Sequence, residues 1–248
     1  MSGVSNPPGH TPSPSLGVHF NAQGQPIGKS LPGWHGCARL PDALPAGRTC
    51  RLTPYASSHA RGLFDAFAQD DGRMWTYLPD GPFATPEDLN RVTENRIHNK
   101  NFHTFSILSH DIEHPIGQAS FMRYDMPNGS VEVGAVTFSP LLRRSIVATE
   151  AMYLMMKHAF DHGYRRYEWK CDQLNAASNQ AALRLGFQFE GVFRNATIYR
   201  GRRRDTAWYS VIAEDWPQVR ARLEAWLDPA NFHSDGVQKQ ALSQMPFP

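Results

Sequence analysis

The sequence has little cysteine, no long apolar run and little net charge. Only three of its 248 residues are cysteines, and this odd, scattered set (Cys37, Cys50 and Cys171) does not make a disulfide framework. No apolar run reaches the roughly 20 residues needed to cross a membrane, and the opening stretch MSGVSNPPGHTPSPS lacks the features of a signal peptide. The formal net charge of +2 provides no concentrated basic field for bulk nucleic-acid binding. We therefore expect a reduced cytoplasmic protein, with neither membrane nor nucleic acid among its partners.

Composition divides the chain into one domain and two extensions. Hydrophobic residues make up 41% of the sequence and include six tryptophans, which is enough for a sizeable core. Residues 1–45 are rich in Pro, Gly and Ser, which predicts an N-terminal arm that is partly disordered or packed on the domain. Residues 46–227 form the domain, and residues 228–248 form a polar C-terminal tail that we expect to be mobile.

Hydrophobic periodicity predicts an α+β domain with a mostly antiparallel sheet. Asn128-Gly129 and Arg200-Gly201 mark hairpin turns, and Pro86 after Thr85 marks the start of a helix. The expected strands are 49–55, 102–109, 115–124, 131–138, 165–171, 187–199 and 204–212. The expected helices are 57–69, 85–98, 147–159, 178–185 and 216–226.

The stretch from Val131 to Met156 is the expected functional centre. It begins as a buried strand and ends as a strongly apolar helix. Between them lies a polar turn that contains two adjacent arginines, Arg143 and Arg144. A helix N-terminus has unpaired N–H groups and a partial positive charge. Strand, basic turn and helix together predict a site for a phosphate-bearing ligand.

This stretch and the sequence after it resemble the GNAT acetyltransferases, and most closely the RimJ/RimL type, which acetylates N-termini of ribosomal proteins. The GNAT loop reads Q/R-x-x-G-x-G/A, and residues 143–148 match its first and last positions, with Ile146 at the middle glycine. A more specific run downstream matches at Asn175, Ser178, Leu185-Gly186-Phe187, Glu190-Gly191 and Arg194. The resemblance covers residues 48–227 and implies the GNAT acyl-CoA N-acyltransferase fold, in which a central strand pair splays apart between flanking helices.

The resemblance further implies acetyl-CoA as the cofactor and an amine as the acceptor. The loop would bind the pyrophosphate, and the splayed strand would bind the pantetheine arm. The residues at these positions are Ala135, Val136, Thr137, Phe138, Arg143, Arg144, Ser145, Ile146, Val147, Ala148 and Thr149, with Asn175 and Ser178 near the arm. Proteins of this type are often dimers, so a homodimer is implied as well.

Glu132 and Ser178 are the candidate catalytic residues. Glu132 lies in an otherwise apolar strand, at the position of the base glutamate of several lysine-acetylating GNATs, and would take the amine proton directly or through water. The alternative is a structural glutamate paired with an arginine of the neighbouring strand. Many GNATs protonate the leaving thiolate with a tyrosine, but this chain has Ala182 at that position. Ser178 is the remaining candidate acid, and its alternative role is to cap the short helix.

Several residues outside the cofactor frame are candidates for acceptor binding. Trp75, Tyr77 and Phe83 lie in a proline-containing loop, and Tyr124 lies at a strand end; core packing is the alternative for all four. Arg194 and the other basic residues of the final hairpin could attract a carboxylate or an acidic peptide, or could form a solvated hairpin tip.

Two other functions remain open. The acceptor could be a small-molecule amine, such as a metabolite or an antibiotic, rather than a peptide N-terminus. The chain could also bind acyl-CoA without turnover. No metal is expected, because His158 and His162 lie four residues apart on a helix but lack a third ligand and the glutamate of a metalloprotease.

Overall fold

The computed structural model describes residues 19–246, which fall into two units. The first unit ends at His35, and its described part contains a short hairpin of β1 (His19–Phe20) and β2 (Pro26–Ile27). The Asn21 side chain shapes the turn, because its Oδ1 accepts the N–H groups of Gln23 and Gln25. The start of the predicted arm lies outside the described residues. The second unit begins at Gly36 and carries the domain.

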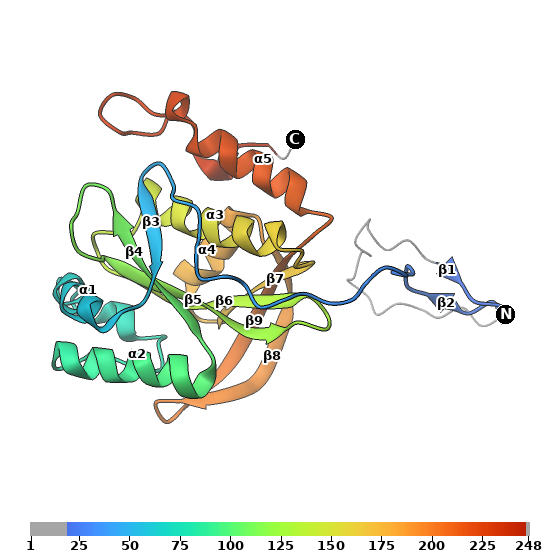
Figure 1. Ribbon diagram of the computed structural model, residues 1–248, viewed down its shortest axis with the longest axis horizontal. Coiled ribbons are helices and arrows are strands. Elements are labelled where there is room, and N and C mark those ends of the chain that lie inside the picture. Colours follow the sequence, from blue (N-terminus) through green and yellow to red (C-terminus); the bar gives the residue numbers. More distant parts are fainter. Residues whose placement is uncertain (1–18, 247–248) are drawn as a thin grey trace. The chain divides into compact units, whose positions relative to one another are not determined.

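One seven-stranded sheet forms the centre of the second unit (Figure 1). The strand order is β3-β4-β5-β6-β7-β9-β8, and only β6 and β7 run parallel. The strands are β3 (Cys50–Pro54), β4 (His103–Ser109), β5 (Gly117–Asp125), β6 (Ser130–Phe138), β7 (Arg166–Asp172), β8 (Gln188–Tyr199) and β9 (Arg202–Ile212). The predicted α+β class with a mostly antiparallel sheet is confirmed.

Five α-helices pack on this sheet, with α3 and α5 on one side and α1 and α2 on the other (Figure 1). Their bounds are α1 (Ala60–Phe67), α2 (Pro86–Lys100), α3 (Ile146–Asp161), α4 (Ala176–Leu185) and α5 (Trp216–Leu227). The short 3-10 helices are η1 (Ser57–His59), η2 (Arg73–Trp75), η3 (Pro229–Asn231) and η4 (Leu242–Gln244). None of the helices within residues 19–246 is long and apolar enough to span a bilayer.

The two faces of the sheet differ in polarity, because successive strand residues point to opposite sides. The face toward α3 is part of the main hydrophobic core, with Phe105, Ile107, Phe121, Val133 and Trp169 among its buried residues. The face toward α1 and α2 carries buried polar side chains instead, which on β4 and β5 are Thr104, Ser106, Gln118 and Ser120. On β4 and β5, the buried polar side chains therefore lie mostly on the face toward α1 and α2.

Part of residues 228–246, which composition predicts to be a polar tail, packs against the core. Leu242 in η4 is buried, and Met245 packs against the same core. Arg222 of α5 donates hydrogen bonds to the carbonyls of both residues. Composition does not predict this arrangement, because the contacts depend on single residues such as Arg222 and Leu242 rather than on an apolar run.

Candidate active site

β6 separates from β7 half-way along its length. The two strands pair only from Ser130 to Val133, whose partners are Arg166 to Trp169. A register shift against β5 follows at Ala135, whose φ of +49° lies in the left-handed region. The sheet therefore leaves the β7-facing peptide groups of residues 135–138 without a strand partner. This is the splayed geometry expected for a strand that binds a pantetheine arm.

α3 begins directly beyond this strand, as the sequence predicts. Ser145 is its N-cap, and its Oγ accepts the Ala148 N–H at 3.1 Å while donating to the Leu142 carbonyl at 2.6 Å. The N–H groups of Ile146 and Val147 precede the first hydrogen bond of the helix and are not used by this cap. These two groups, at the positive end of a 16-residue helix, suit a phosphate.

Three arginines surround this helix start, and they have different environments. Arg143 donates to the Phe138 carbonyl and to Asp70. Arg144 is exposed and has a φ of +57°. Arg184 of α4 donates to the Thr149 hydroxyl at 3.1 Å, and burial lowers its pKa. The hydroxyl of Thr149 is thereby engaged, whereas the loop arginines keep part of their surface exposed.

Asn175 and Ser178 have distinct roles at the start of α4. Asn175, rather than Ser178, is the N-cap, and its Oδ1 accepts the Ser178 N–H at 3.1 Å. The alternative that Ser178 caps this helix is therefore wrong. Its hydroxyl accepts the indole N–H of Trp169 at 3.0 Å instead. Because Trp169 forms the last rung shared with β6, Ser178 lies beside the point where the two strands part.

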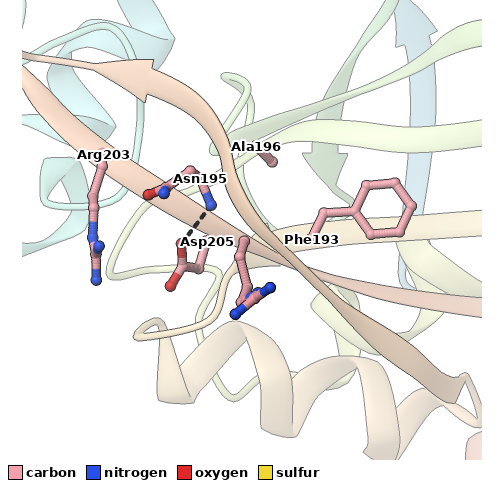
Figure 2. Close-up of a pocket in the computed structure, with 6 residues that line it drawn as sticks. Phe193, Asn195, Ala196, Arg203 and Asp205 are labelled. Atoms are coloured by element: carbon pink, nitrogen blue, oxygen red, sulfur yellow. Dashed lines mark hydrogen bonds between the residues drawn. The ribbon is translucent and has the colours of Figure 1, made fainter.

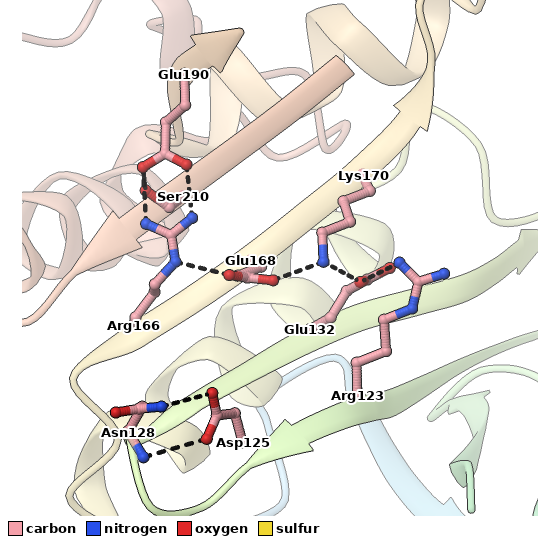
Figure 3. Close-up of polar contacts among 9 residues, drawn as sticks. All are labelled: Arg123, Asp125, Asn128, Glu132, Arg166, Glu168, Lys170, Glu190 and Ser210. Carbon is pink, nitrogen blue, oxygen red and sulfur yellow. Dashed lines mark hydrogen bonds and ion pairs between the residues drawn. The ribbon is translucent and has the colours of Figure 1, made fainter. Parts of the chain in front are cut away.

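Glu132 belongs to a chain of charged groups on the polar face of the sheet (Figure 3). Its Oε2 accepts from Lys170 of β7 at 2.8 Å and from Arg123 of β5 at 3.1 Å. Lys170 also contacts Glu168 at 2.7 Å, and Arg166 joins Glu168 to Glu190. Arg123 lies on the neighbouring strand, so this contact is the one expected if Glu132 is a structural residue instead of the catalytic base.

The other charged groups in this row influence one another's pKa values. Burial raises the pKa of Glu168, but Lys170 and Arg166 outweigh that effect and leave the pKa below its ordinary value. Bonds from Arg166 lower the pKa of Glu190, and the Ser210 hydroxyl adds a third bond at 2.6 Å. The Lys170 ammonium also lies 3.7 Å from the centre of the Trp208 ring. These ion pairs therefore fix the side chains on the sheet surface beside the point where β6 and β7 separate.

The structure brings together only part of the predicted aromatic wall. Trp75 is buried and contacts Phe83 edge-to-face, with ring centres 5.3 Å apart. Tyr77 is half-buried in the same loop. Tyr124 lies elsewhere, against Tyr164 and under the guanidinium of Arg39. Trp75 and Phe83 therefore form one aromatic cluster, from which Tyr124 is separate.

Arg194 lines a pocket of about 800 Å³ on the final hairpin (Figure 2). The other lining residues all come from β8 and β9, namely Phe193, Asn195, Ala196, Arg203 and Asp205. Asn195 has a φ of +52° and donates its N–H to Asp205 at 2.7 Å, which closes a bulge. None of the residues lining this pocket belongs to the predicted cofactor frame or aromatic loop.

The tip of the same hairpin holds the aromatic loop. Arg200 donates to the carbonyls of Leu78 and Gly81, and Arg202 donates to that of Thr76. Sequence reasoning missed these contacts, because they join segments more than 100 positions apart. It also missed the ion pairs of Lys170 with Glu132 and of Asp70 with Arg143, which join segments that are well separated in the sequence.

Comparisons with known proteins agree with this geometry. A family model described as "Acetyltransferase (GNAT) domain" matches residues 50–188. A crystal structure of a GCN5-related N-acetyltransferase from Brucella melitensis shares 37% identity at a TM-score of 0.83, and covers 86% of this chain and 98% of that one. Ribosomal-protein-serine acetyltransferase of Escherichia coli (strain K12) shares 24% identity over 71% of this chain and 99% of that protein. RimL, solved in complex with coenzyme A, shares 22% identity at a TM-score of 0.59, and covers 69% of this chain and 98% of that one.

The chain therefore belongs to the GNAT acetyltransferase family. It is an N-acetyltransferase, and its cofactor is acetyl-CoA. The splayed strand and the start of α3 have the free peptide groups and positive charge that this cofactor needs.

Proposed function

We propose that the acceptor is the α-amino group of a peptide or protein N-terminus. The likeness to ribosomal-protein-serine acetyltransferase supports this, because it extends over 99% of that protein. An α-amino group has an ordinary pKa near 8, so a substantial fraction is neutral at physiological pH. A weak or water-relayed base then suffices, whereas the more basic amine of a lysine side chain would require a stronger base to remove its proton.

Acetyl-CoA supplies the acetyl thioester, and the chain holds and orients it. In this proposal the N–H groups of Ile146 and Val147, together with Arg143, bind the pyrophosphate. Peptide groups of residues 135–138 that face β7 without pairing with it would bind the pantetheine arm, and one of their N–H groups would polarise the thioester carbonyl. The unpaired backbone beyond Val133 is the observation that carries this assignment.

The amine attacks the thioester directly while both substrates are bound. Glu132, one position before the last shared rung, takes the proton directly or through water. Ser178 donates to the departing sulfur. Its hydroxyl oxygen already accepts from Trp169, so its own proton points away from the indole.

A thiol-release assay tests the proposed acceptor. The panel contains a peptide with a free N-terminal serine, the same peptide with a blocked N-terminus and an internal lysine, and free small amines. We expect the free N-terminus to be preferred by roughly tenfold or more in kcat/KM. A preference for small amines would contradict the peptide proposal. Coenzyme A binding without acceptor-dependent thiol release would instead indicate a non-catalytic binding protein.

A further inference from the structure

Arg143, the proposed pyrophosphate ligand, is already held by two acceptors. Its Nη2 donates to Asp70 Oδ1 at 2.5 Å, and its Nε donates to the Phe138 carbonyl at 3.3 Å. Two anchors fix a side chain that otherwise has many rotamers to lose on binding. Its side chain remains 41% exposed, so part of the guanidinium can still meet a ligand.

Asp70, the ion-pair partner of Arg143, is more buried than an ordinary surface carboxylate. Its side chain is only 3% exposed, and its second oxygen, Oδ2, accepts the N–H groups of Gly72 at 2.8 Å and Met74 at 2.9 Å. Burial raises the pKa of Asp70, but its bonds with Met74, Arg143 and Gly72 outweigh this and leave the pKa below its ordinary value. These bonds shape the turn that leads into η2 and the buried Trp75.

The same carboxylate also lies beside the aromatic loop, whose residues are candidates for acceptor binding. Asp70 lines a small pocket of about 110 Å³, whose other walls are mostly apolar and include Phe67, Trp75 and Phe83. One oxygen of Asp70 therefore contacts the cofactor loop, while the other supports the loop that carries the aromatic cluster.

We propose that Asp70 is a positioning residue that orients Arg143 before acetyl-CoA arrives. Because Asp70 also fixes the turn before Trp75, binding of the pyrophosphate is coupled to the conformation of the aromatic loop. Such coupling is reciprocal, so a ligand that orders the loop also favours the cofactor-ready orientation of Arg143. This inference rests on the proposed function, since it requires Arg143 to contact the pyrophosphate.

Asp70→Asn separates the two contacts. The amide keeps an oxygen for Gly72 and Met74 but turns an NH2 group toward Arg143, which removes only the arginine anchor. Coenzyme A and pantetheine, which lacks the pyrophosphate, are titrated calorimetrically into wild type, Asp70→Asn, Arg143→Met and the double variant. We expect Asp70→Asn to raise the Kd for coenzyme A about tenfold and leave that for pantetheine unchanged. The double variant should be no weaker than Arg143→Met alone, because Asp70 acts through Arg143.

The matched control is Asp65→Asn, which breaks the exposed 2.9 Å ion pair with Arg61 on α1 and should change neither affinity. Equal weakening of both ligands, additive losses in the double variant, or unchanged or tighter coenzyme A binding by Asp70→Asn would each overturn the inference. If Asp70→Asn does not fold, Asp70→Glu, which keeps the charge but displaces the carboxylate from Arg143, replaces it: selective weakening of coenzyme A supports the inference, and unchanged affinity overturns it. If Arg143→Met itself leaves coenzyme A affinity unchanged, the proposed cofactor site fails independently of Asp70.

Discussion

Glu150 is a single buried carboxylate that ties α3 to the start of β3. Its Oε1 accepts the Arg48 N–H at 2.8 Å. Its Oε2 accepts the N–H and hydroxyl of Thr49, at 2.6 and 2.5 Å, and the Cys50 N–H at 3.1 Å. Burial raises the pKa of Glu150, but these bonds outweigh burial and leave the pKa below its ordinary value of 4.5. The charge of Glu150 therefore stabilises the folded state.

We predict that Glu150→Gln lowers the free energy of unfolding by about 2 kcal/mol at neutral pH, as measured by urea denaturation. Because the pKa is depressed by folding, the contribution of the charge is complete above pH 4.5 and is lost as the pH falls through the lower folded-state value. The exposed Glu113→Gln is the control and should have little effect. A cost for Glu150→Gln that stays constant down to about pH 3 would mean that the charge is not its source.

Glu132 can be tested against its own ion-pair partner. Glu132→Gln and Arg123→Met break the same 3.1 Å contact, but only the first removes the candidate base. We expect Glu132→Gln to lower kcat about a hundredfold while Arg123→Met keeps most of it. Thermal unfolding of both variants corrects for lost stability. Full turnover by a folded Glu132→Gln enzyme would leave Glu132 with the structural role alone.

Within single elements, two irregular strand positions shape the site. Arg123 in β5 and Ala135 in β6 both have a φ of +49°, a region that usually belongs to glycine. Register shifts in the pairing of β5 with β6 accompany both residues. Neither residue type signals a bulge, so the sequence pattern did not predict either one. The family resemblance predicted that this strand separates from its neighbour near Ala135, and periodicity alone does not predict this separation.

A buried arginine anchors α5 to the neighbouring segments. Arg222 is buried and donates to the carbonyls of Arg184, Leu242 and Met245, which joins α4 and the C-terminal segment to α5. We predict that Arg222→Met costs about 3 kcal/mol of unfolding free energy, because buried carbonyls lose their donor. Hydrogen exchange should rise at residues 242–246.

The control for that experiment is Arg220→Met on the same helix. Arg220 is far more exposed and forms an i,i+4 pair with Glu224, so its loss should cost well under 1 kcal/mol. Unchanged exchange in the C-terminal segment of Arg222→Met would show that the hydrophobic contacts of Leu242 hold it without the arginine.

For the whole molecule, local patterns predicted the order of the elements but not their long-range contacts. Each predicted strand and helix of the domain overlaps an observed one, because periodicity and turn residues are local signals. The pairing of β9 with β8 is a local hairpin, whereas its pairing with β7 depends on residues far apart in sequence. The same holds for the contacts of Asp70, Lys170 and Arg200, so the polar framework of the site had no local signal.

The stability of the domain depends on where the chain begins to contact it. The second unit begins at Gly36, and its first residues contact the domain at several points. Leu40 is buried in the core, and the Tyr164 hydroxyl donates to the Ala38 carbonyl at 3.0 Å. Asp42 lies 2.8 Å from the imidazole of His103. These contacts precede residue 46, where composition places the domain boundary.

We therefore predict that deletion of residues 2–35 leaves the Tm within about 2 °C of wild type, whereas deletion of residues 2–45 lowers it by roughly 10 °C. The larger effect follows from the exposed cavity left by Leu40 and from the lost polar contacts. Calorimetry on both truncations, with Leu40→Ala in the full chain as the matched variant, provides the measurement. Leu40→Ala should reproduce part of the second loss, because it removes the apolar contact alone. An equal drop in Tm for the two truncations would instead show that the first unit stabilises the domain, and would move the boundary toward the N-terminus.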